Sequence, residues 1–403
     1  MPMSPSTPDP VTPAGASIGV GMVGHAFMGA VHAHAWRSVH RFFDVPLVPR
    51  LAVLGGRDPE RTKAAAAKQG WPDTETDWAT LVARDDVGIV DICTPGDSHA
   101  EIALAALAAG KHVLCEKPLA NSVAEAEEMA AAAERAAANG QRAMVGFNYR
   151  RVPAIALARK MVAEGRLGTI RQVRAAYLQD WLADPATPMT WRLRKDKAGS
   201  GALGDIAAHA VDTAQFVLGD RITGVSAMTE TFVRERPLSG EPGSALGEVD
   251  VDDCAVFLAR FTGGAVATFE ATRFALGRKN ALRLEINGSR GSLAFDFESM
   301  NELSFYDGDD DPAEAGFRRI LVTEPGHPYV GAWWPPGHLL GYEHTFTHEI
   351  ADFLTAIGEQ RDPEPGFADG LQVQRVLHAV EESAGNGTSW VGVSMSTERV
   401  IDA

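Results

Sequence analysis

The first third of the chain alternates short apolar runs with helix-forming stretches, and this alternation restricts the possible folds more than any other feature. The run at 88–94 is almost continuously apolar, which is typical of a strand buried on both faces of a parallel sheet. Similar runs lie at 17–23, 51–54, 111–115 and 143–147, with helix-forming stretches between them at 59–69, 98–109 and 122–138. Short connections between such alternating elements predict a doubly wound α/β domain.

The first apolar run overlaps a glycine-rich segment whose register has to be decided. The literal Gly-x-Gly-x-x-Gly pattern consists of Gly19, Gly21 and Gly24. A dinucleotide-binding turn must follow a strand, but the sequence Thr-Pro-Ala-Gly-Ala at 12–16 cannot form one. The literal pattern therefore does not mark the turn.

A register shifted by five residues meets this requirement. Residues 17–23 then form the strand, the turn runs from Gly24 to Gly29, and a helix begins at Phe27. Ala26 takes the place of the second glycine, which normally lets the backbone approach a pyrophosphate closely. Because its methyl group is small, we predict that the helix N-terminus still binds the phosphates of a dinucleotide.

The segment Glu116-Lys117-Pro118 closes the apolar run at 111–115. Open parallel sheets bind ligands beyond the carboxyl ends of their strands. A lysine at that place can reach both a cofactor and a substrate hydroxyl. The alternative is a solvated lysine before a proline that starts a helix.

Beyond residue 148 the pattern changes from alternation to a succession of strands. Helices are expected at 153–164 and about 205–217, with a strand at 170–179. Strand-like segments follow at 222–232, 251–261, 264–274, 281–286, 292–297, 302–306 and 319–322. Neighbouring strands joined by glycine-containing turns predict a C-terminal α+β domain with a large, mostly antiparallel open sheet. The acidic residues Asp250, Asp252 and Asp253 are interpreted as a solvated turn.

These patterns divide the chain into a disordered leader (1–16), a dinucleotide-binding Rossmann domain (17–148) and an α+β domain (149–403), for which the family resemblance given below implies substrate binding and oligomerisation. Two C-terminal helices, at 345–358 and 367–384, are expected to pack back onto the Rossmann domain.

Charge and composition exclude several classes of partner. The net charge is −16, from 37 basic and 53 acidic residues, which argues against nucleic acid and anionic membranes. No apolar run is long enough to span a membrane, and the leader lacks the blocks of a signal peptide. The three cysteines, Cys93, Cys115 and Cys254, form neither an even disulfide set nor a zinc-ligand spacing. We predict no bound metal and a cytoplasmic location.

A second group of polar residues follows the glycine-rich segment Gly199-Ser200-Gly201. Asp205 and His209 are four residues apart in a predicted helix and would share one face. A carboxylate beside an imidazole is a common acid–base arrangement. The alternative is that Asp205 is an ordinary N-terminal helix residue and His209 a core histidine.

These motifs together resemble the glucose–fructose oxidoreductase / inositol dehydrogenase / MocA (Gfo/Idh/MocA) family. The resemblance rests on the turn that ends in Phe27-Met28-Gly29, on the Glu-Lys-Pro segment and on Asp205 with His209, and it covers nearly the whole chain from residue 18. The segments 147–151, 177–181 and 191–192 are most similar to the levoglucosan dehydrogenase branch of that family.

The resemblance implies an enzyme with NAD or NADP as cofactor. The implied reaction oxidises a secondary hydroxyl of a sugar, an anhydrosugar or an inositol to a ketone, and the implied assembly is a homodimer or homotetramer built on the second sheet. The implied catalytic set is Lys117, Asp205 and His209. In this set His209 is the base, Asp205 orients it, and Lys117 binds the substrate oxygen.

The remaining candidate residues lie at the strand ends and in the segments that carry the resemblance. The candidates for cofactor binding are Gly24, Ala26, Phe27, Met28, Arg57, Thr94, Pro95, His99, Glu116, Lys117, Asn148, Trp191 and Arg192. The candidates for substrate binding are Lys117, Tyr149, Arg151, Gln179, Trp181, Asp205 and His209.

The cofactor choice depends on the end of the second strand. An acidic residue there usually binds the adenosine ribose, but this chain has Gly55-Gly56-Arg57 instead. Without that carboxylate a 2′-phosphate meets no repulsion, and Arg57 can pair with it, which favours NADP over NAD. The alternatives are a solvated Arg57 and a ribose contact from Asp58.

Two other functions remain open at this point. One is an epimerase or glycosidase that holds NAD tightly and returns the hydride to the same sugar. The other is a nucleotide-binding regulator without catalytic activity. The presence of Lys117, Asp205 and His209 together argues against the regulator.

Overall fold

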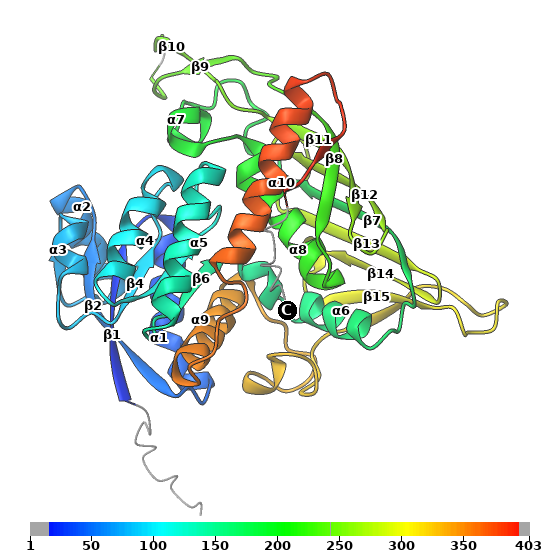
Figure 1. Cartoon of the computed structure of the whole chain (residues 1–403), viewed down its shortest axis with the longest axis horizontal. Coiled ribbons are helices and arrows are strands. Elements are labelled where there is room, and N and C mark those ends of the chain that lie inside the picture. The colour runs from blue at the N-terminus through cyan, green and yellow to red at the C-terminus, as the bar shows by residue number, and fades with distance from the viewer. Residues whose placement is uncertain (1–15, 242, 395–403) are drawn as a thin grey trace, which may run out of the picture.

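The computed structural model describes residues 16–241 and 243–394 and arranges them around two sheets (Figure 1). The first sheet has six parallel strands in the order β3-β2-β1-β4-β5-β6. Its strands are β1 (Ala16–Val23), β2 (Leu47–Gly55), β3 (Thr74–Glu75), β4 (Ile89–Ile92), β5 (His112–Glu116) and β6 (Ala143–Gly146). The order reverses at β1, so the predicted doubly wound sheet is confirmed. Residues 1–15 of the predicted leader lie outside the described residues, and Ala16 begins β1.

Five helices connect these strands: α1 (Phe27–Phe42), α2 (Pro59–Gln69), α3 (Trp78–Val82), α4 (His99–Ala108) and α5 (Val123–Ala137). Local sequence signals explain their ends. The Asp58 side chain caps α2 by accepting from the Arg61 N–H, a proline occupies the start, and Gly70 ends the helix in the left-handed conformation. The predicted bounds 59–69 are therefore those observed.

Helices cover both faces of the first sheet. One face packs against α1 and α9 (Tyr342–Gly358) through an apolar cluster that includes Trp36, Val39, Phe346 and Phe353. The other face packs against α4 and α5, and α10 (Phe367–Gly385) lies along α5. The predicted return of the two C-terminal helices to the first domain is confirmed.

The second sheet has nine strands in the order β16-β15-β14-β13-β7-β12-β11-β8-β17. They are β7 (Ile170–Leu178), β8 (Ile222–Glu230), β11 (Cys254–Phe261), β12 (Val266–Thr272), β13 (Ala281–Gly288), β14 (Gly291–Asp296), β15 (Glu302–Asp307), β16 (Arg318–Leu321) and β17 (Val391–Gly392). All neighbours are antiparallel except β7 and β12, which run parallel. The predicted, mostly antiparallel sheet is confirmed.

One face of the second sheet is covered by α6 (Pro153–Ala163), α8 (Ala208–Leu218) and α10, and the other is open (Figure 1). Burial alternates along β11 accordingly: Phe257 and Phe261 are buried, whereas Val256 and Leu258 are exposed. The short α7 (Lys195–Ala198) lies in the connection between β7 and α8.

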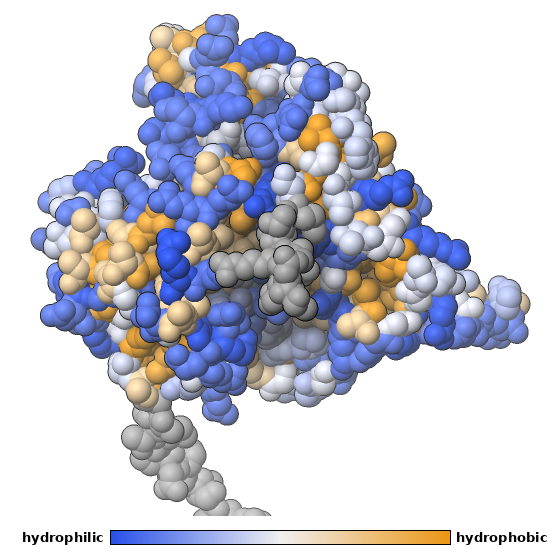
Figure 2. Space-filling model, in the orientation of Figure 1, coloured by the Kyte–Doolittle hydropathy of each residue, from blue (hydrophilic) through white to orange (hydrophobic). Residues whose placement is uncertain are grey.

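The sequence did not predict a hairpin between β8 and β11, formed by β9 (Glu235–Pro237) and β10 (Leu246–Glu248). It projects at the top of the molecule in Figure 1, where Figure 2 shows apolar residues at the surface, and Leu238 and Leu246 are exposed in this segment. In the described ranges, no helix is both long and apolar enough to cross a membrane.

Candidate active site

The glycine turn lies between β1 and α1, in the shifted register. Gly24 has φ +103°, a conformation that favours glycine, and a Cβ there would come within 2.6 Å of the Cys93 carbonyl oxygen. Its N–H donates to the Gly55 carbonyl at 2.9 Å, which joins the ends of β1 and β2. Gly19 lies within β1 instead, where a Cβ would overlap the Asp86 carbonyl oxygen. Gly19 is therefore required for packing, and a valine there would disturb the sheet directly.

The N-terminus of α1 is open to an anion. Ala26 is its exposed N-cap residue, and within the described structure no side chain caps the helix and no acidic residue lies in its first turn. The first N–H groups of a helix have no partner inside it, and they carry a partial positive charge. An uncapped terminus beside Gly24 fits the pyrophosphate of a dinucleotide.

Replacement of Ala26 by aspartate is expected to weaken NADH binding by roughly 10- to 100-fold, because the carboxylate would repel the pyrophosphate. Aspartate is also a good N-cap and should stabilise the isolated fold by about 0.5–2 kcal/mol relative to alanine. The measurement is an NADH titration beside a thermal melt, with Ala26→Asn as the control that caps without charge. Equal NADH affinity for the two variants would contradict the binding of the pyrophosphate at the N-terminus of α1.

Further candidates follow neighbouring strands at the same edge. Arg57 follows β2, Thr94 and Pro95 follow β4, and Lys117 follows β5. Since the strand order is β2-β1-β4-β5, these residues flank the glycine turn on both sides. The carboxyl edge at the reversal of strand order is where open α/β sheets bind their ligands.

Two predicted cofactor contacts are engaged within the protein instead. The ring of His99 is buried between the carbonyl oxygens of Thr94 (Nε2, 2.9 Å) and Pro118 (Nδ1, 3.0 Å). The buried Asn148 donates its side-chain amide to Thr345 Oγ1 at 2.8 Å. His99 therefore joins the loops after β4 and β5, and Asn148 ties β6 to α9; neither is free to bind a ligand.

Glu116, another predicted cofactor contact, is also buried. Its carboxylate accepts from His32 Nε2 at 3.0 Å and from the Lys117 backbone N–H at 3.1 Å. The other ring nitrogen of His32 lies 3.0 Å from Asp91 Oδ2, and Trp36 donates to the same oxygen at 2.7 Å. Glu116 thus fixes the backbone of Lys117 at the carboxyl end of β5, through a hydrogen bond inside the first domain.

The charge state of this network follows from its pairing. Burial, the largest single effect, would lower the pKa of His32, but the charges and hydrogen bonds of Asp91 and Cys93 together outweigh it and raise that pKa well above the ordinary value. Metal-ligating atoms of His32, Asp91 and Cys93 lie within 4.8 Å of one another. Because both ring nitrogens of His32 face carboxylates, we interpret this group as an ion-pair network, and the absence of a metal stays a prediction.

Lys117 and Asp205 meet although 88 positions separate them in the sequence. The Lys117 ammonium donates to the backbone oxygen of Asp205 at 2.7 Å and lies 3.4 Å from its Oδ1. Asp205 belongs to a π-helical turn, Leu203–Ala207, which leads into α8. The sequence-based pairing of these two residues at one site agrees with this geometry.

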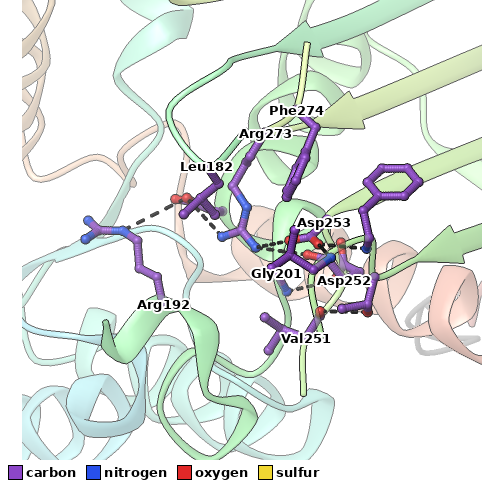
Figure 3. Close-up of polar contacts among 12 residues, drawn as sticks. Leu182, Arg192, Gly201, Val251, Asp252, Asp253, Arg273 and Phe274 are labelled. Carbon is purple, nitrogen blue, oxygen red and sulfur yellow. Dashed lines mark hydrogen bonds and ion pairs between the residues drawn. The ribbon is translucent and has the colours of Figure 1, made fainter. Parts of the chain in front are cut away.

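Two arginines complete the surroundings of Asp205. Arg192 Nε lies 4.0 Å and Arg273 Nη1 lies 3.8 Å from its Oδ2. In Figure 3, Arg192 approaches from the side opposite Arg273. Burial alone would raise the pKa of Asp205, but Lys117, Arg273 and Arg192 together lower it below the ordinary value. Asp205 is therefore a permanently ionised acceptor at neutral pH.

His209 lies on α8 in an aromatic surrounding. Its ring stacks on Tyr149 with centroids 4.4 Å apart, and Phe147 and Tyr177 meet it edge-on at 6.0 Å each. Burial, and to a lesser extent the charge of Lys117, lower the pKa of His209 well below 6.5. The imidazole is therefore neutral at neutral pH, the form that can accept a proton.

The expected pairing of Asp205 with His209 is not formed. Among the described residues Nδ1 of His209 has no hydrogen-bond partner, and Asp205 is held by three cations instead. The π-helical turn widens the helix at this point, so residues four apart are not aligned as in an α-helix. Stacking on Tyr149 orients His209, and Asp205 does not.

The predicted substrate contacts Tyr149, Gln179 and Trp181 form one hydrogen-bonded row. The hydroxyls of Tyr149 and Tyr177 are 2.7 Å apart, and that of Tyr177 donates to Asn280 Oδ1 at 2.6 Å. Gln179 donates to the same oxygen at 2.8 Å and accepts from Trp181 Nε1 at 2.9 Å. The row begins beside His209 and ends at Trp181, whose ring lies 5.7 Å from the Arg273 guanidinium.

Arg151 does not belong to this row, contrary to prediction. Its buried side chain forms an ion pair with Asp352 at 3.1 Å and donates to the Glu364 carbonyl oxygen. It therefore ties the segment after β6 to α9 and to the loop before α10, and it does not bind substrate.

Trp191 and Arg192 pack against each other, with the Arg192 guanidinium 4.4 Å from the centre of the Trp191 ring. The helix α7 that follows is tied to the first domain, because Lys197 pairs with Asp97 at 2.8 Å and accepts from Asn121 at 2.9 Å through its carbonyl. Both residues were predicted to bind the cofactor, and Arg192 also lies 4.0 Å from Oδ2 of Asp205, a predicted substrate contact.

Sequence reasoning missed three parts of the site. Arg273 and Asn280 are single polar residues next to strands, and no local motif marks them. Asp253, interpreted as solvated, is buried, and Asp252 is half-buried and accepts from the Gly201 and Leu203 N–H groups at 2.7 and 2.8 Å. The apolar neighbours Val249 and Val251 were the available signal for this burial.

The sequence matches two family models. Residues 18–147 match an oxidoreductase family with an NAD-binding Rossmann fold, and residues 155–294 match the GFO/IDH/MocA C-terminal domain. Among curated proteins, the levoglucosan dehydrogenase of Pseudarthrobacter phenanthrenivorans is 42% identical over 94% of this chain and 98% of that protein.

Solved structures agree with these matches. An oxidoreductase domain protein from Kribbella flavida is 68% identical, with a TM-score of 0.91 and coverage of 94% of this chain and 100% of that one. A levoglucosan dehydrogenase in complex with NADH and levoglucosan is 42% identical, with a TM-score of 0.89 and coverage of 94% and 99%. The chain is thus similar over nearly its whole length to NADH-binding sugar enzymes.

Proposed function

The chain belongs to the Gfo/Idh/MocA family of NAD-binding oxidoreductases, and we propose that it oxidises a secondary hydroxyl of an anhydrosugar or a related pyranose to a ketone. We assign cofactor binding to residues 17–148 and substrate binding to residues 149–403. One observation carries the proposal: the Lys117 ammonium is bound to Asp205 beside the carboxyl edge of the first sheet, and its charge acts on the neutral imidazole of His209. Substrate preference for an anhydrosugar is supported by the full-length similarity to levoglucosan dehydrogenase.

The residues around the glycine turn fit a dinucleotide. Gly24 and the uncapped start of α1 would hold the pyrophosphate, Arg57 lies on the adenosine side, and Thr94 and Pro95 lie toward Lys117. When bound, the nicotinamide supplies a hydride acceptor for the carbinol carbon.

The remaining chemistry belongs to the chain itself. Loss of hydride makes the hydroxyl proton acidic, and the neutral imidazole of His209 accepts that proton. The Lys117 ammonium, fixed on the backbone of Asp205, donates a hydrogen bond to the same oxygen and stabilises the developing alkoxide. The ionised Asp205 holds Lys117 and accepts from a neighbouring substrate hydroxyl.

The test is a panel of anhydrosugars, pyranoses and inositols, each assayed by cofactor absorbance with NAD and with NADP. We expect net cofactor reduction, strongest with the anhydrosugars. An epimerase would release its product without net absorbance change and would copurify with cofactor. A regulator would bind cofactor and change no sugar, and this outcome would end the enzymatic proposal.

We also propose that NADP is accepted beside NAD, through Arg57. Arg57 is exposed, and the Asp58 carboxylate is engaged in capping α2 and in an ion pair with Arg61 at 3.4 Å. A 2′-phosphate would therefore meet a guanidinium and no free carboxylate from Asp58. The NADH found with levoglucosan dehydrogenase supports use of the unphosphorylated cofactor as well.

Replacement of Arg57 by alanine is expected to raise the KM for NADP more than that for NAD. A charge-assisted contact contributes roughly 1.5–3 kcal/mol, which corresponds to a change in cofactor preference of about 10- to 150-fold. The exposed Lys68→Ala variant on the same helix is the control for charge alone, because it leaves the Asp58–Arg61 pair intact. An equal effect of Arg57→Ala on both cofactors would leave Arg57 as a surface residue.

The open face of the second sheet supports a homo-oligomer, which we propose as the assembly. Met228, Val256, Leu258 and Val266 are exposed there on the adjacent strands β8, β11 and β12. A contiguous apolar patch of this kind usually marks an interaction surface. Molar mass in solution decides the matter, and a monomer at micromolar concentration would contradict the proposal.

A further inference from the structure

Arg273 is the most deeply buried charge beside the proposed catalytic residues. It follows β12, and its side chain has no exposed surface. In Figure 3 its guanidinium lies between Asp252 and Asp253, called here the acidic pair, on one side and Arg192 on the other. A buried guanidinium is costly unless carboxylates or carbonyls compensate its charge, so its surroundings indicate what it does.

Its contacts divide into a fixed side and a side that faces the site. On the fixed side Nη2 donates to the Asp252 carbonyl at 2.9 Å and lies 4.0 Å from Asp253 Oδ1. On the other side Nη1 lies 3.8 Å from Asp205 Oδ2. Nε and Nη1 have no hydrogen-bond partner among the described residues. The guanidinium is thus anchored from behind, and its unengaged end faces Asp205.

The acidic pair is itself held rigidly by backbone groups. Asp252 accepts from the N–H groups of Gly201 and Leu203, at the start of the turn that carries Asp205. Asp253 accepts from the Phe232 and Val233 N–H groups at 2.9 and 3.2 Å, at the base of the β9–β10 hairpin. The anchor of Arg273 therefore connects the hairpin base to the turn of Asp205.

Gly201 shows how closely these parts are packed. A Cβ at Gly201 would overlap the Asp252 carbonyl oxygen and would lie 2.8 Å from Arg273 Nη2. Gly201 is the second glycine of the segment Gly199-Ser200-Gly201 that precedes Asp205. Its lack of a side chain lets Asp252 and Arg273 reach the backbone of the catalytic turn.

We propose that Arg273 is a positioning residue that orients the Asp205 carboxylate and keeps it charged, so that Asp205 can hold both Lys117 and a substrate hydroxyl. This inference rests on the proposed function, because its readout is sugar oxidation. It assigns Arg273 no contact with substrate. The Arg192 side chain is 38% exposed, and it approaches Oδ2 of Asp205 from the solvent side.

Several other charged or titratable groups, from different helices, strands and loops, surround Asp205 and Arg273. Lys117 and Arg192 face Asp205, whereas Asp252 and Asp253 face Arg273. Three neutral groups, the hydroxyls of Tyr149 and Tyr177 and the imidazole of His209, also lie near Asp205 but do not bond to it. The buried Arg236 on β9 lies beyond Asp253. Of Arg236 and Arg273, Arg273 is the one paired with Asp205.

The test compares Arg273→Met, Arg273→Lys and Arg236→Met in the full-length protein. Arg236 is an equally buried arginine that bonds the Leu182 and Asp184 carbonyls and does not contact Asp205, so it controls for the structural cost of losing such a side chain. The readouts are NADH affinity, the split between kcat and KM for the best sugar, and the pH profile of kcat/KM.

For Arg273→Met we expect kcat/KM to fall about 10- to 100-fold and its acidic limb to move up by about one pH unit, because Asp205 loses a buried cation. NADH affinity should stay as in the wild type. Arg273→Lys keeps the charge and should keep the wild-type limb with a smaller loss of kcat/KM. Arg236→Met should keep the wild-type limb whatever it costs in stability.

Three outcomes overturn the inference. The first is an unchanged acidic limb of kcat/KM in Arg273→Met, and the second is an equal shift of that limb in Arg236→Met. The third applies if Arg273→Met does not fold: it is a wild-type kcat/KM in Arg273→Lys. A wild type that oxidises no sugar in the panel is a different result, because it ends the proposed function before Arg273 is tested.

Discussion

Replacement of Lys117 by methionine is expected to lower kcat for sugar oxidation by roughly 10³-fold, the range observed when a donor to a developing oxyanion is lost. Lys117 follows β5 at the carboxyl edge, and its ammonium is fixed on Asp205 at 2.7 Å. Methionine keeps the length of the side chain but cannot donate. NADH affinity should change little, since the pyrophosphate is assigned to the start of α1 on the neighbouring side of the sheet.

Lys160→Met is the matched control, because Lys160 is an exposed lysine on α6. The comparison uses initial rates at saturating cofactor, with an NADH titration of each variant. A wild-type kcat in Lys117→Met would exclude Lys117 from the chemistry. A loss of NADH binding equal to the loss of kcat would instead make Lys117 a cofactor ligand.

Replacement of His209 by glutamine is expected to lower kcat by about 10²- to 10⁴-fold, because general-base catalysis contributes on that scale. The sign of the pH dependence follows from the lowered pKa of His209, which keeps the wild-type ring neutral above pH 6.5. Wild-type oxidation should therefore persist below pH 6.5 and fall only at still lower pH. The glutamine variant should lose this acidic limb of kcat together with the rate, whereas the limb that Asp205 sets in kcat/KM should remain.

Stability gives an independent readout of the same group. Unfolded histidine takes up a proton near pH 6.5, but the buried His209 resists it, so its contribution to stability is present above pH 6.5 and is lost as the pH falls below that value. Replacement by glutamine should remove this part of the acid sensitivity in urea unfolding. If His209→Gln keeps both the acidic limb and the wild-type kcat, Lys117 with a solvent water becomes the better base.

The first domain could be predicted closely from sequence. Its strands are buried on both faces, so each appears as an apolar run, and its helices carry local end signals such as Asp58 and Gly70. The turn register was decided by asking which glycine follows a possible strand, and Gly24 is the one with a positive φ. The family and its levoglucosan dehydrogenase branch were also predicted and are confirmed by the matched family models and relatives.

The substrate side was harder, because tertiary contacts decide it. The relation between Asp205 and His209 depends on a π-helical turn, which the spacing of four residues does not reveal. Arg273 follows β12 and Asn280 precedes β13, so the two reach the site from different strands, and no local pattern marks them.

Buried polar residues account for the other differences. Glu116, Asn148 and Arg151 lie in the segments that carry the family resemblance, and His99 begins α4, yet the side chains of all four are used within the protein. Each satisfies backbone or side-chain groups that would otherwise be buried without partners. A motif therefore identifies the segment at a site, and only the fold shows which of its side chains face outward.

The most direct test of the central claim follows the hydride itself. The best sugar of the panel, deuterated at its ring carbons, is converted by the wild type and by Lys117→Met, and the cofactor and sugar are analysed by mass spectrometry. We predict one deuterium in the reduced cofactor for each molecule of ketone formed by the wild type, and almost none with Lys117→Met. Deuterium that remains in, or returns to, the sugar without net reduced cofactor would contradict the assignment of this site as a sugar dehydrogenase.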